Sequence, residues 1–529
     1  MSQDMGASEQ MLWTEPTRRR LSSKFVGMAV GITLAVGGCV TGGYYLATGL
    51  SGSAADGACA AASITLVQSI PIGDFSISRV SGAIPTHEAF LRLADTATST
   101  LDVTAMYVDL LGTEDQKFFN KSQMDNFGAA RGAAVFAALD DAGRRGVAVR
   151  LLLGIGVGKD PLNSTEVRRL LLHPSVQART WAPKQWYGGG IMHMKLWHSD
   201  RTAAYVGSAN PDWKSLAQVK ELGLLINGSA VRNDSSAADP KGATRDLGAI
   251  FEVFWRWANP ALVPTQSKVW SEAFQTTLTL PPWDPAVPAE DRSVSPISSG
   301  LKAVYNAENQ QPVCSTSSWS QTPGSVPHAF VTASPGGAVT DGRTPDIDAL
   351  LLTIRSATTN LSLNVMDFLP ASAFDGGHGG APIYWPALTD AIISVAYAKP
   401  VRVRLLVSKW AHTGWEQAGA MRQLADGLQA CAHAWQRCAG SLEVRQYVVP
   451  GWNLTKGASP TYPSFTRVNH QKYIVSDKRL NVGTSNWQWG YFHNTAGTSY
   501  NTDDPELVAA AQAVFDADWE SPYAEPCCD

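Results

Sequence analysis

The chain has 529 residues, more than a single domain usually needs, so two domains or one doubled unit is expected. Its hydrophobic fraction of 44%, its charged fraction of 17% and its 18 tryptophans supply material for a large core, which excludes a disordered or fibrous protein. The formal net charge is −4, so any nucleic acid would have to bind in a local groove rather than in a general basic field.

The N-terminal segment predicts where the protein resides. Residues 25–50 carry no charge, and at a rise of about 1.5 Å per residue they are long enough to span a bilayer of about 30 Å. Four basic residues precede this stretch and place that end in the cytosol: Arg18, Arg19, Arg20 and Lys24. We therefore expect a cytosolic tail over residues 1–24, a transmembrane signal-anchor over 25–50 and a stalk over 51–69. A cleaved signal peptide is the alternative, and it also puts the body of the protein in the secretory pathway.

Glycosylation sequons and cysteines agree with a lumenal location. Six N-x-S/T sequons follow the apolar segment, at Asn120, Asn163, Asn227, Asn233, Asn360 and Asn453. Six of the cysteines also follow it, and the most local disulfide candidate among them is Cys431–Cys438. The cysteine spacing does not fit a zinc site, and the remaining connectivity stays open.

The chain contains an internal repeat. Three pairs of segments match in the same order: 101–110 with 361–369, 147–153 with 401–407, and 193–200 with 470–477. Strand-like segments alternate with helical ones, so we expect an α/β fold of two α/β/α sandwich halves around a pseudo-twofold axis. The first half is predicted over residues 70–290, a linker and irregular segment over 291–345, and the second half over 346–525.

The third pair of segments carries a pattern that predicts chemistry. The pattern H-x-K-x4-D occurs in both copies, as His193, Lys195 and Asp200 and as His470, Lys472 and Asp477. In a strand, a histidine and a lysine two residues apart point to the same face, so they can converge on one anion. Each copy is followed by a small-residue turn that supplies a hydroxyl and an amide, Ser208 with Asn210 and Thr484 with Asn486.

This set of side chains suits a phosphodiester. Two lysines and two asparagines would donate to the non-bridging oxygens as charge builds in the transition state. One histidine can attack phosphorus to form a phosphohistidine while the other protonates the leaving oxygen, and the roles then reverse with water or an alcohol. Because the lysines neutralise the substrate, neither a metal nor another cofactor is expected. The alternative, two structural pairs of strand histidine and lysine, is disfavoured by the doubling.

These motifs resemble the phospholipase D superfamily, and within it the single-span lysosomal branch that includes the third and fourth mammalian phospholipase-D-like proteins. The resemblance rests on segments 207–223, 467–472, 483–487 and 495–499 and covers nearly everything from about Ile70 to Tyr523. It implies a duplicated phospholipase D fold and a lysosomal, metal-independent 5′-to-3′ exonuclease acting on single-stranded DNA or RNA. By analogy with the family, His193 is the nucleophile and His470 the general acid and base.

Three carboxylates accompany the two motifs. Glu221 follows His193 by 28 residues, where related enzymes place a carboxylate that holds the histidine ring, and no acid stands at the matching place after His470. A histidine bonded to a carboxylate is the better nucleophile, so we expect Glu221 to orient His193. Asp200 and Asp477 either orient site residues or hold their own loops, and a structural salt-bridge role is favoured.

Aromatic residues near the motifs give a weaker signal. Five tryptophans lie close to the motif strands and could stack nucleic-acid bases, although core packing is the commoner role: Trp197, Trp213, Trp410, Trp487 and Trp489. Three histidines lie nearby, where a structural role is the favoured interpretation: His198, His412 and His493.

The expected partners follow from these predictions. The substrate is a single-stranded nucleic acid or a phospholipid, the membrane is reached through one N-terminal helix, and a homodimer stays open. The alternative function is a phospholipase D or transphosphatidylase acting on lysophospholipids, and a catalytically silent lumenal adaptor is the least favoured. The expected location is the lumenal side of the endoplasmic reticulum, Golgi, endosome and lysosome system, as a type II membrane glycoprotein or a released soluble form.

Overall fold

The computed structural model describes most of the chain beyond the predicted stalk. The described residues are 62–155, 160–183, 189–228, 243–260, 267–271, 276–280, 311–312, 328–335, 344–372, 383–432, 437–457 and 459–527. The predicted cytosolic tail and membrane span therefore lie outside them. Within the described ranges, no helix is both long and apolar enough to cross a membrane.

The first half is built on a mixed sheet with the strand order β2-β1-β8-β7-β6-β3-β4-β5. In chain order its strands are β1 (Ala62–Ser69), β2 (Ile84–Pro85), β3 (Thr100–Ala105), β4 (Ala148–Gly154), β5 (Val176–Trp181), β6 (Leu196–Ser199), β7 (Ala203–Gly207) and β8 (Glu221–Gly228). The strands β3, β4 and β5 run parallel, whereas β6, β7 and β8 pair antiparallel with their neighbours.

The second half repeats this sheet, with the order β11-β12-β18-β17-β16-β13-β14-β15-β19. Its strands are β11 (Gln311–Pro312), β12 (His328–Ser334), β13 (Asn360–Val365), β14 (Arg402–Lys409), β15 (Ser441–Val448), β16 (Lys472–Ser476), β17 (Leu480–Gly483), β18 (Gly497–Thr502) and β19 (Ala524–Pro526). A two-stranded sheet of β9 (Ser267–Ser271) and β10 (Thr276–Leu280) stands apart. The run β1-β8-β7-β6-β3-β4-β5 thus corresponds to β12-β18-β17-β16-β13-β14-β15, which confirms the predicted duplication.

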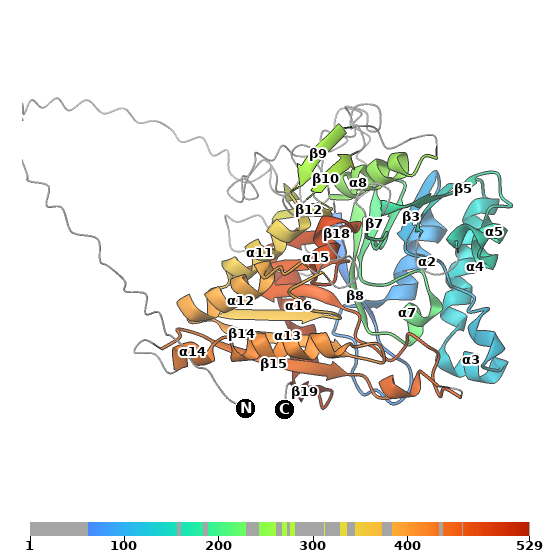
Figure 1. Ribbon diagram of the computed structural model, residues 1–529. Helices are drawn as coiled ribbons and strands as arrows, with labels where there is room; N and C mark the ends of the chain where they lie inside the picture. Colours follow the sequence, from blue (N-terminus) through green and yellow to red (C-terminus); the bar gives the residue numbers. More distant parts are fainter. Residues whose placement is uncertain are drawn as a thin grey trace, which may run out of the picture. The chain divides into compact units, whose positions relative to one another are not determined.

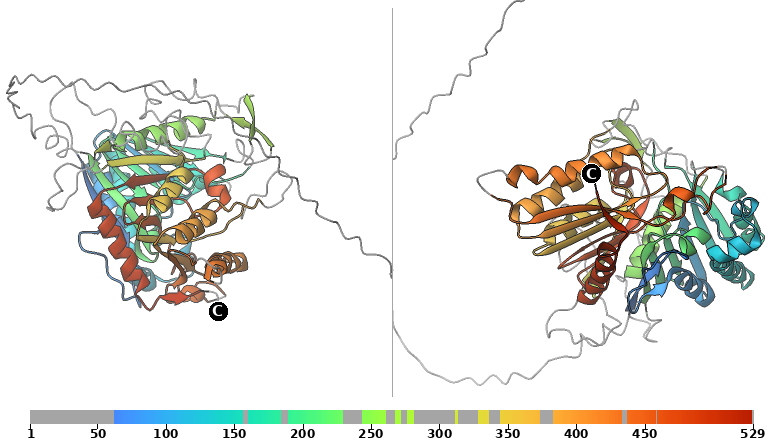
Figure 2. Two further views of the ribbon diagram at one scale, coloured as in Figure 1. Left: turned by 90° about the vertical axis from the view of Figure 1, so that its left-hand side faces the viewer. Right: turned by 90° about the horizontal axis from the view of Figure 1, so that it is seen from below.

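Helices connect the strands and cover the sheets (Figures 1 and 2). In the first half they are α2 (Thr86–Thr96), η1 (Asp115–Lys117), α3 (Lys121–Phe127), α4 (Ala130–Arg144), η2 (Pro161–Asn163), α5 (Thr165–Leu170), α7 (Trp213–Ala217) and α8 (Ala243–Trp257). In the second they are α11 (Asp346–Ser356), α12 (Ala387–Ala398), α13 (Trp415–Asp426), α14 (Gln429–Ala432), η4 (Trp452–Leu454), α15 (Trp489–His493) and α16 (Pro505–Trp519).

The hydrophobic core joins the two halves. One buried cluster combines α8 and β6 to β8 of the first half with β12, β16 to β18 and α16 of the second half, including Phe251, Tyr473 and Trp519. Each half also has an outer cluster of its own, under α2, α4 and α5 in the first and under α11, α12 and α13 in the second. The shared cluster removes the apolar faces of both sheets from water together, so the halves form one core rather than two separate sandwiches.

Two predicted boundaries are wrong. Residues 62–69, expected in the stalk, form β1, which pairs with β8 along its whole length. Apolar and polar residues alternate only weakly in this strand, and Ile64, Leu66 and Val67 are all buried. The stalk was assigned from its composition, and composition does not reveal such a strand. Residues 328–334, expected in the linker, form β12 and pair with β18. Most of the rest of the predicted linker lies outside the described residues.

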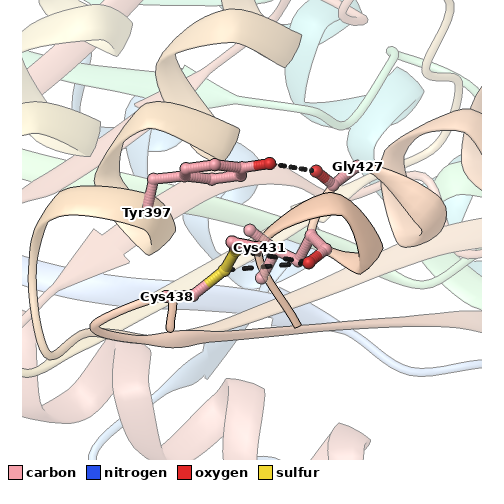
Figure 3. Close-up of a disulfide and its surroundings, with 5 residues drawn as sticks. Tyr397, Gly427, Cys431 and Cys438 are labelled. Carbon is pink, nitrogen blue, oxygen red and sulfur yellow. Dashed lines mark hydrogen bonds between the residues drawn. A yellow bond between two sulfur atoms is a disulfide. The ribbon is translucent and has the colours of Figure 1, made fainter. Parts of the chain in front are cut away.

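A disulfide joins Cys431 and Cys438, as the short spacing predicts, with 5.4 Å between the two Cα atoms (Figure 3). Beside it, the Tyr397 hydroxyl donates to the carbonyl of Gly427 at 3.2 Å. The bridge therefore ties α14 to the chain that leads into β15, at the edge of the second half where β14 begins.

A buried ion pair crosses from one half to the other. Lys220, just before β8, donates to Asp518 of α16 at 2.7 Å, and the two side chains are 0% and 1% exposed. The same ammonium also donates to Gln471 at 3.0 Å. Two charges removed from water are tolerated only when each satisfies the other, so removing one partner leaves the other without compensation.

We predict that Asp518→Asn lowers the free energy of unfolding by about 3–5 kcal/mol, because it leaves the buried Lys220 ammonium unneutralised. Chemical denaturation of the purified protein measures this change. The control is Lys121→Ala, which removes an exposed pair with Asp125 and should change stability by at most about 0.5 kcal/mol. Equal effects of the two substitutions would contradict a stabilising role for the crossing ion pair.

Candidate active site

His193 lies between β5 and β6, and the other half holds its backbone. Its N–H donates to the carbonyl of Ala496 at 3.1 Å, and the N–H of Ala496 donates back to Ile191 at 2.9 Å. This short parallel pairing joins the segment before β6 to the segment before β18. The His193 side chain is 5% exposed, so its position is set by packing as well as by these bonds.

His470 is held in the pseudo-symmetric way. Its N–H donates to the carbonyl of Lys220 at 2.8 Å, and the N–H of Lys220 donates to Val468 at 3.0 Å. The segment before β16 in the second half thus pairs with the segment before β8 in the first half. Each histidine is therefore presented by its own half and fixed by the other, so both lie where the two halves meet.

The two imidazoles face each other across a small gap. Their ring centroids are 6.4 Å apart, and the ring planes make an angle of 71°. Lys195 donates to the carbonyl of His193 at 2.7 Å, and Lys472 donates to the carbonyl of His470 at 2.6 Å. Each ammonium has three hydrogens and uses one here, so both keep donors for an anion held between the rings.

Burial and the two lysines lower the pKa of both histidines. Burial, followed by the charges of Lys195 and Lys472, holds the pKa of His193 well below its usual value, although the backbone of Thr484 acts in the opposite direction. Burial also lowers the pKa of His470 to about 4, where Glu221 raises it and Lys472 lowers it again. An arriving phosphodiester anion would offset the lysine charges and make protonation of either ring easier.

The lysines are affected in the same direction. Burial lowers the pKa of Lys472 to about 8, against the raising effects of Glu221 and Asp367. Burial and the neighbouring charge of Lys472 hold the pKa of Lys195 well below its usual value. Burying two ammonium groups costs free energy, and that cost falls when an anion binds between them and contacts both. The charges of the site therefore favour the binding of an anion.

Glu221 lies on the other histidine from the one expected. Its carboxylate contacts Nδ1 of His470, with Oε2 at 2.9 Å and Oε1 at 3.0 Å, and it does not hold His193. The prediction counted residues along one repeat, whereas the first residue of β8 reaches across the axis to the histidine of the second half. Burial raises the pKa of Glu221, but His470 and Lys472 outweigh that effect and keep it low, so the side chain is ionised.

The counterpart of Glu221 is a glycine. The pairing of Lys220 with Asn469 corresponds to that of Ala496 with Met192, so Gly497, the first residue of β18, occupies the place of Glu221. A Cβ at Gly497 would lie 2.4 Å from the Ser485 hydroxyl and 2.6 Å from the Ser334 hydroxyl, so no carboxylate fits there. In agreement, Nδ1 of His193 is buried and has no hydrogen-bond partner among the described residues.

Asp200 and Asp477 lie away from the reacting groups, which corrects their place in the predicted catalytic set. Asp200, after β6, accepts from the backbone N–H groups of Thr98, Ser99 and Thr100 at 2.7–2.8 Å. Asp477, after β16, accepts in the same way from residues 358–360. These amides lower the pKa of Asp200 against burial, so both carboxylates act as anchors for the loops before β3 and β13. Asp477 also forms a salt bridge of the kind expected, with Lys478 at 3.6 Å.

Three of the four predicted phosphate-binding groups have other partners. Ser208 exchanges hydrogen bonds with the backbone of Leu222, and the Thr484 hydroxyl accepts from Thr498. The Asn486 amide donates to Asp367 at 3.0 Å and to the Tyr491 hydroxyl at 3.2 Å, which uses both of its hydrogens. The sequence indicated that these side chains lie near the site, but it did not reveal the neighbouring groups that form hydrogen bonds with them. Phosphate binding by Asn210 stays a prediction.

Two side chains that the sequence analysis left out complete the site. Tyr491 of α15 packs edge-on against His193, with 5.0 Å between ring centroids. Asp367, just after β13, is part-buried, and burial raises its pKa to about 6 against the lowering effects of Lys472 and Trp410. Asp367 lies within the repeated segment 361–369, so the repeat itself was the signal that could have found it. Within the part of the chain that the structure describes, no group of three or more potential ligands is arranged to hold a metal ion.

The two halves match two family descriptions separately. Residues 95–237 match "Cardiolipin synthase, PLD-like domain", and residues 306–452 match "PLD3/4, PLD-like domain". The first match includes His193 with Lys195, and the second includes β13, which pairs with β16, the strand that follows His470.

Similar proteins extend over most of the chain. "Phospholipase D Z" of Dictyostelium discoideum is 31% identical over 470 residues, covering 88% of this chain and 92% of that protein. "5'-3' exonuclease PLD3" of Homo sapiens is 30% identical over 463 residues, covering 87% of this chain and 79% of that protein. A phosphatidylserine synthase structure from Haemophilus influenzae overlays with a TM-score of 0.46 at 12% identity, covering 84% of this chain and 85% of that one, a likeness too loose to carry an argument.

The doubled sheet explains why the relatives match along both halves, and the two histidines with their lysines lie where the halves meet. With a relative that is 31% identical along 92% of its own length, this chain belongs to the phospholipase D superfamily of phosphodiesterases.

Proposed function

We propose that this phosphodiesterase is a 5′-to-3′ exonuclease that cleaves single-stranded nucleic acid through a phosphohistidine. The observation that carries the chemistry is the pair of opposed imidazoles, 6.4 Å apart, each with a buried lysine beside it. A phosphate group between them contacts both rings and both ammonium groups at once. Such a site stabilises charge on phosphorus oxygens where water is largely excluded.

In the first step the neutral His193 ring attacks phosphorus while His470 gives its proton to the departing oxygen. A P–N bond forms and the P–O bond to the leaving nucleotide breaks. In the second step His470 removes a proton from water, the water oxygen attacks phosphorus, and the P–N bond breaks to restore His193. The positive charge needed at the phosphate comes from Lys195 and Lys472, so the proposed reaction uses no metal.

Because Glu221 contacts His470, it cannot activate His193 as the sequence analysis expected, and in this proposal it supports His470 as the acid instead. A carboxylate on Nδ1 stabilises the imidazolium form of His470, which favours proton donation from the other ring nitrogen. His193 has no such partner among the described residues and is held neutral by burial and by the lysines, which leaves its lone pair available for attack. The first residues of β8 and β18, Glu221 and Gly497, thus distinguish the acid from the nucleophile.

The choice of nucleic acid rests on the relatives and on charge. Several relatives at about 30% identity are named 5'-3' exonuclease. The chain has a net charge of −4, which suits an end-binding site for a short single strand better than a surface for a long duplex. A phospholipase D or transphosphatidylase acting on phospholipids is the second candidate, because other relatives of equal identity are named phospholipase D.

We further propose that the enzyme works on the lumenal side of an acidic compartment. The uncharged segment 25–50, the basic residues before it and the sequons after it support a type II membrane glycoprotein or its released form. An acidic location also suits the site, because Lys472, whose pKa is about 8, is then fully charged.

We predict stepwise release of mononucleotides from the 5′ end of a single-stranded oligonucleotide at about pH 5 with a chelator present. A 5′-hydroxyl substrate should be cleaved and a 5′-phosphate substrate should not, and His193→Ala should reduce the rate by about a thousandfold or more because it removes the nucleophile. Chromatography of the products over time measures both the rate and the direction.

The outcome decides between the two candidates. If neither oligonucleotide is cleaved and a lysophospholipid is hydrolysed by the same preparation, the nucleic-acid proposal fails and the lipid candidate replaces it. Mass spectrometry of an acid-labile nucleoside phosphate adduct on the peptide that contains His193 tests the covalent step separately. An intermediate trapped on His470 instead would reverse the proposed roles.

We predict that Glu221→Gln shifts the alkaline limb of the kcat/KM profile to lower pH. Glu221 raises the pKa of His470, so a neutral glutamine lowers that pKa below its present value of about 4. Because the general acid must be protonated in the free enzyme, activity at pH 5 should then fall by about tenfold or more. Steady-state kinetics across the acidic range measures the limbs.

A matched control comes from the same half. Glu166 is also a buried carboxylate, 3% exposed, but it binds the N–H of Leu111 and touches neither histidine. Glu166→Gln should leave both limbs in place. If Glu221→Gln moves the acidic limb instead of the alkaline one, His470 is the nucleophile and His193 the acid.

A further inference from the structure

Three aromatic side chains form a layer at the surface of the second half, which we call the aromatic platform: Trp410, His412 and Phe465. The rings of His412 and Phe465 are parallel, with 4.7 Å between centroids and 2° between planes. Trp410 lies 4.7 Å from His412 at 50°. Phe465 is 54% exposed and His412 is exposed, so this stack is open to solvent rather than part of the core.

The platform adjoins the His470 side of the site. Trp410 directly follows β14, whose neighbour β13 pairs with Lys472 through Val365. The Asn469 N–H donates to the Ser408 hydroxyl at 3.2 Å, which ties the end of β14 to the residue before His470. Trp410 also packs against Val219, Met366 and Val468, which flank that segment. Ligands of such sheets bind beyond the carboxyl ends of the parallel strands, where the platform lies.

The loop that carries Phe465 holds an unfavourable backbone. Phe465 and Arg467 have φ angles of 62° and 54°, in the left-handed region that residues other than glycine rarely adopt. The buried Arg467 guanidinium fixes this loop by donating to Pro450 at 2.6 Å and to Ile72 at 2.8 Å. Local strain that the surroundings maintain is concentrated at functional sites, and here it places an aromatic ring in solvent.

Two lysine side chains lie close to the platform. The exposed Lys456 donates to the carbonyl of Ala411, between Trp410 and His412. The ammonium of Lys409 lies 5.4 Å from the centre of the Trp452 ring on the neighbouring loop. Flat aromatic faces interleaved with lysines are the pattern that binds unpaired bases together with their phosphates.

We propose that the aromatic platform stacks the base of the nucleotide on the leaving-oxygen side of the scissile phosphodiester. The assignment to that side rests on the proposed function, in which His470 protonates the leaving oxygen, because Trp410 packs against Val468, two residues before His470. In a 5′-exonuclease this base is the second from the 5′ end. Stacking uses the face common to all bases, so the platform selects unpaired bases without selecting sequence.

The test compares Phe465→Ala with the unaltered protein on three oligonucleotides: an intact one, one without the base at position two, and one without the base at position five. On the intact and position-five substrates, kcat/KM should fall by about tenfold to a hundredfold, as expected for one lost stacking contact. On the position-two substrate the substitution should have no effect, because the base that it would stack is absent.

Two further variants separate stacking from damage to the fold. Phe465→Tyr retains an aromatic face and should keep activity close to that of the unaltered protein. Tyr397→Ala removes a part-exposed ring at the end of α12, before β14 begins and thus at the opposite end of that strand from Trp410, and should leave all three substrates unaffected.

The proposal is overturned if Phe465→Ala lowers kcat/KM equally on all three substrates, or if the effect disappears on the position-five substrate instead of the position-two substrate. Either result leaves the exonuclease function intact. If the unaltered protein cleaves none of the oligonucleotides, the exonuclease function fails and the platform proposal fails with it. A Phe465→Ala variant that still cleaves the position-two substrate at the unaltered rate excludes misfolding as the cause of the effect.

Discussion

Four short backbone hydrogen bonds between the halves determine the whole site. His193 is bonded to the segment before β18, and His470 to the segment before β8. Because each pairing joins residues from different halves, neither histidine has a defined position until both halves have folded and met. The buried Lys220–Asp518 pair and the shared hydrophobic cluster stabilise this arrangement, since both lie on the same interface. The interactions that stabilise the interface therefore also fix the positions of the two histidines.

The pseudo-symmetry of the frame contrasts with the asymmetry of the proton chemistry. Both halves supply a histidine, a lysine and a carbonyl that fixes that lysine. They differ where β8 and β18 begin, with Glu221 in one and Gly497 in the other. The hydroxyls of Ser334 and Ser485 fill the space beside Gly497, so the difference is built into the packing. Duplication within one chain permits this divergence, which two identical subunits could not achieve.

The doubled fold and the central side chains could be predicted from the sequence because both depend on local patterns. Strand periodicity and the repeated H-x-K pattern singled out His193, Lys195, His470 and Lys472, and the structure brings the two histidine rings within 6.4 Å of each other. The partner of Glu221 could not be predicted in this way, since a contact across a pseudo-twofold axis leaves no trace in spacing along one repeat. The strand β1 was missed for a related reason, because β8, the strand that it pairs with, lies far away in the chain.

The two halves also differ in length where substrate would lie. His193 follows Val147 by 46 residues, whereas His470 follows Val401 by 69 residues. The second interval carries α13, the disulfide and the aromatic platform. In the proposed function, the strand edges that bind the phosphate are thus common to both halves, while the platform proposed to contact the rest of the substrate comes from the longer connection. Chemistry and substrate choice can change separately in such a molecule, because the loops are anchored on a frame that they do not alter.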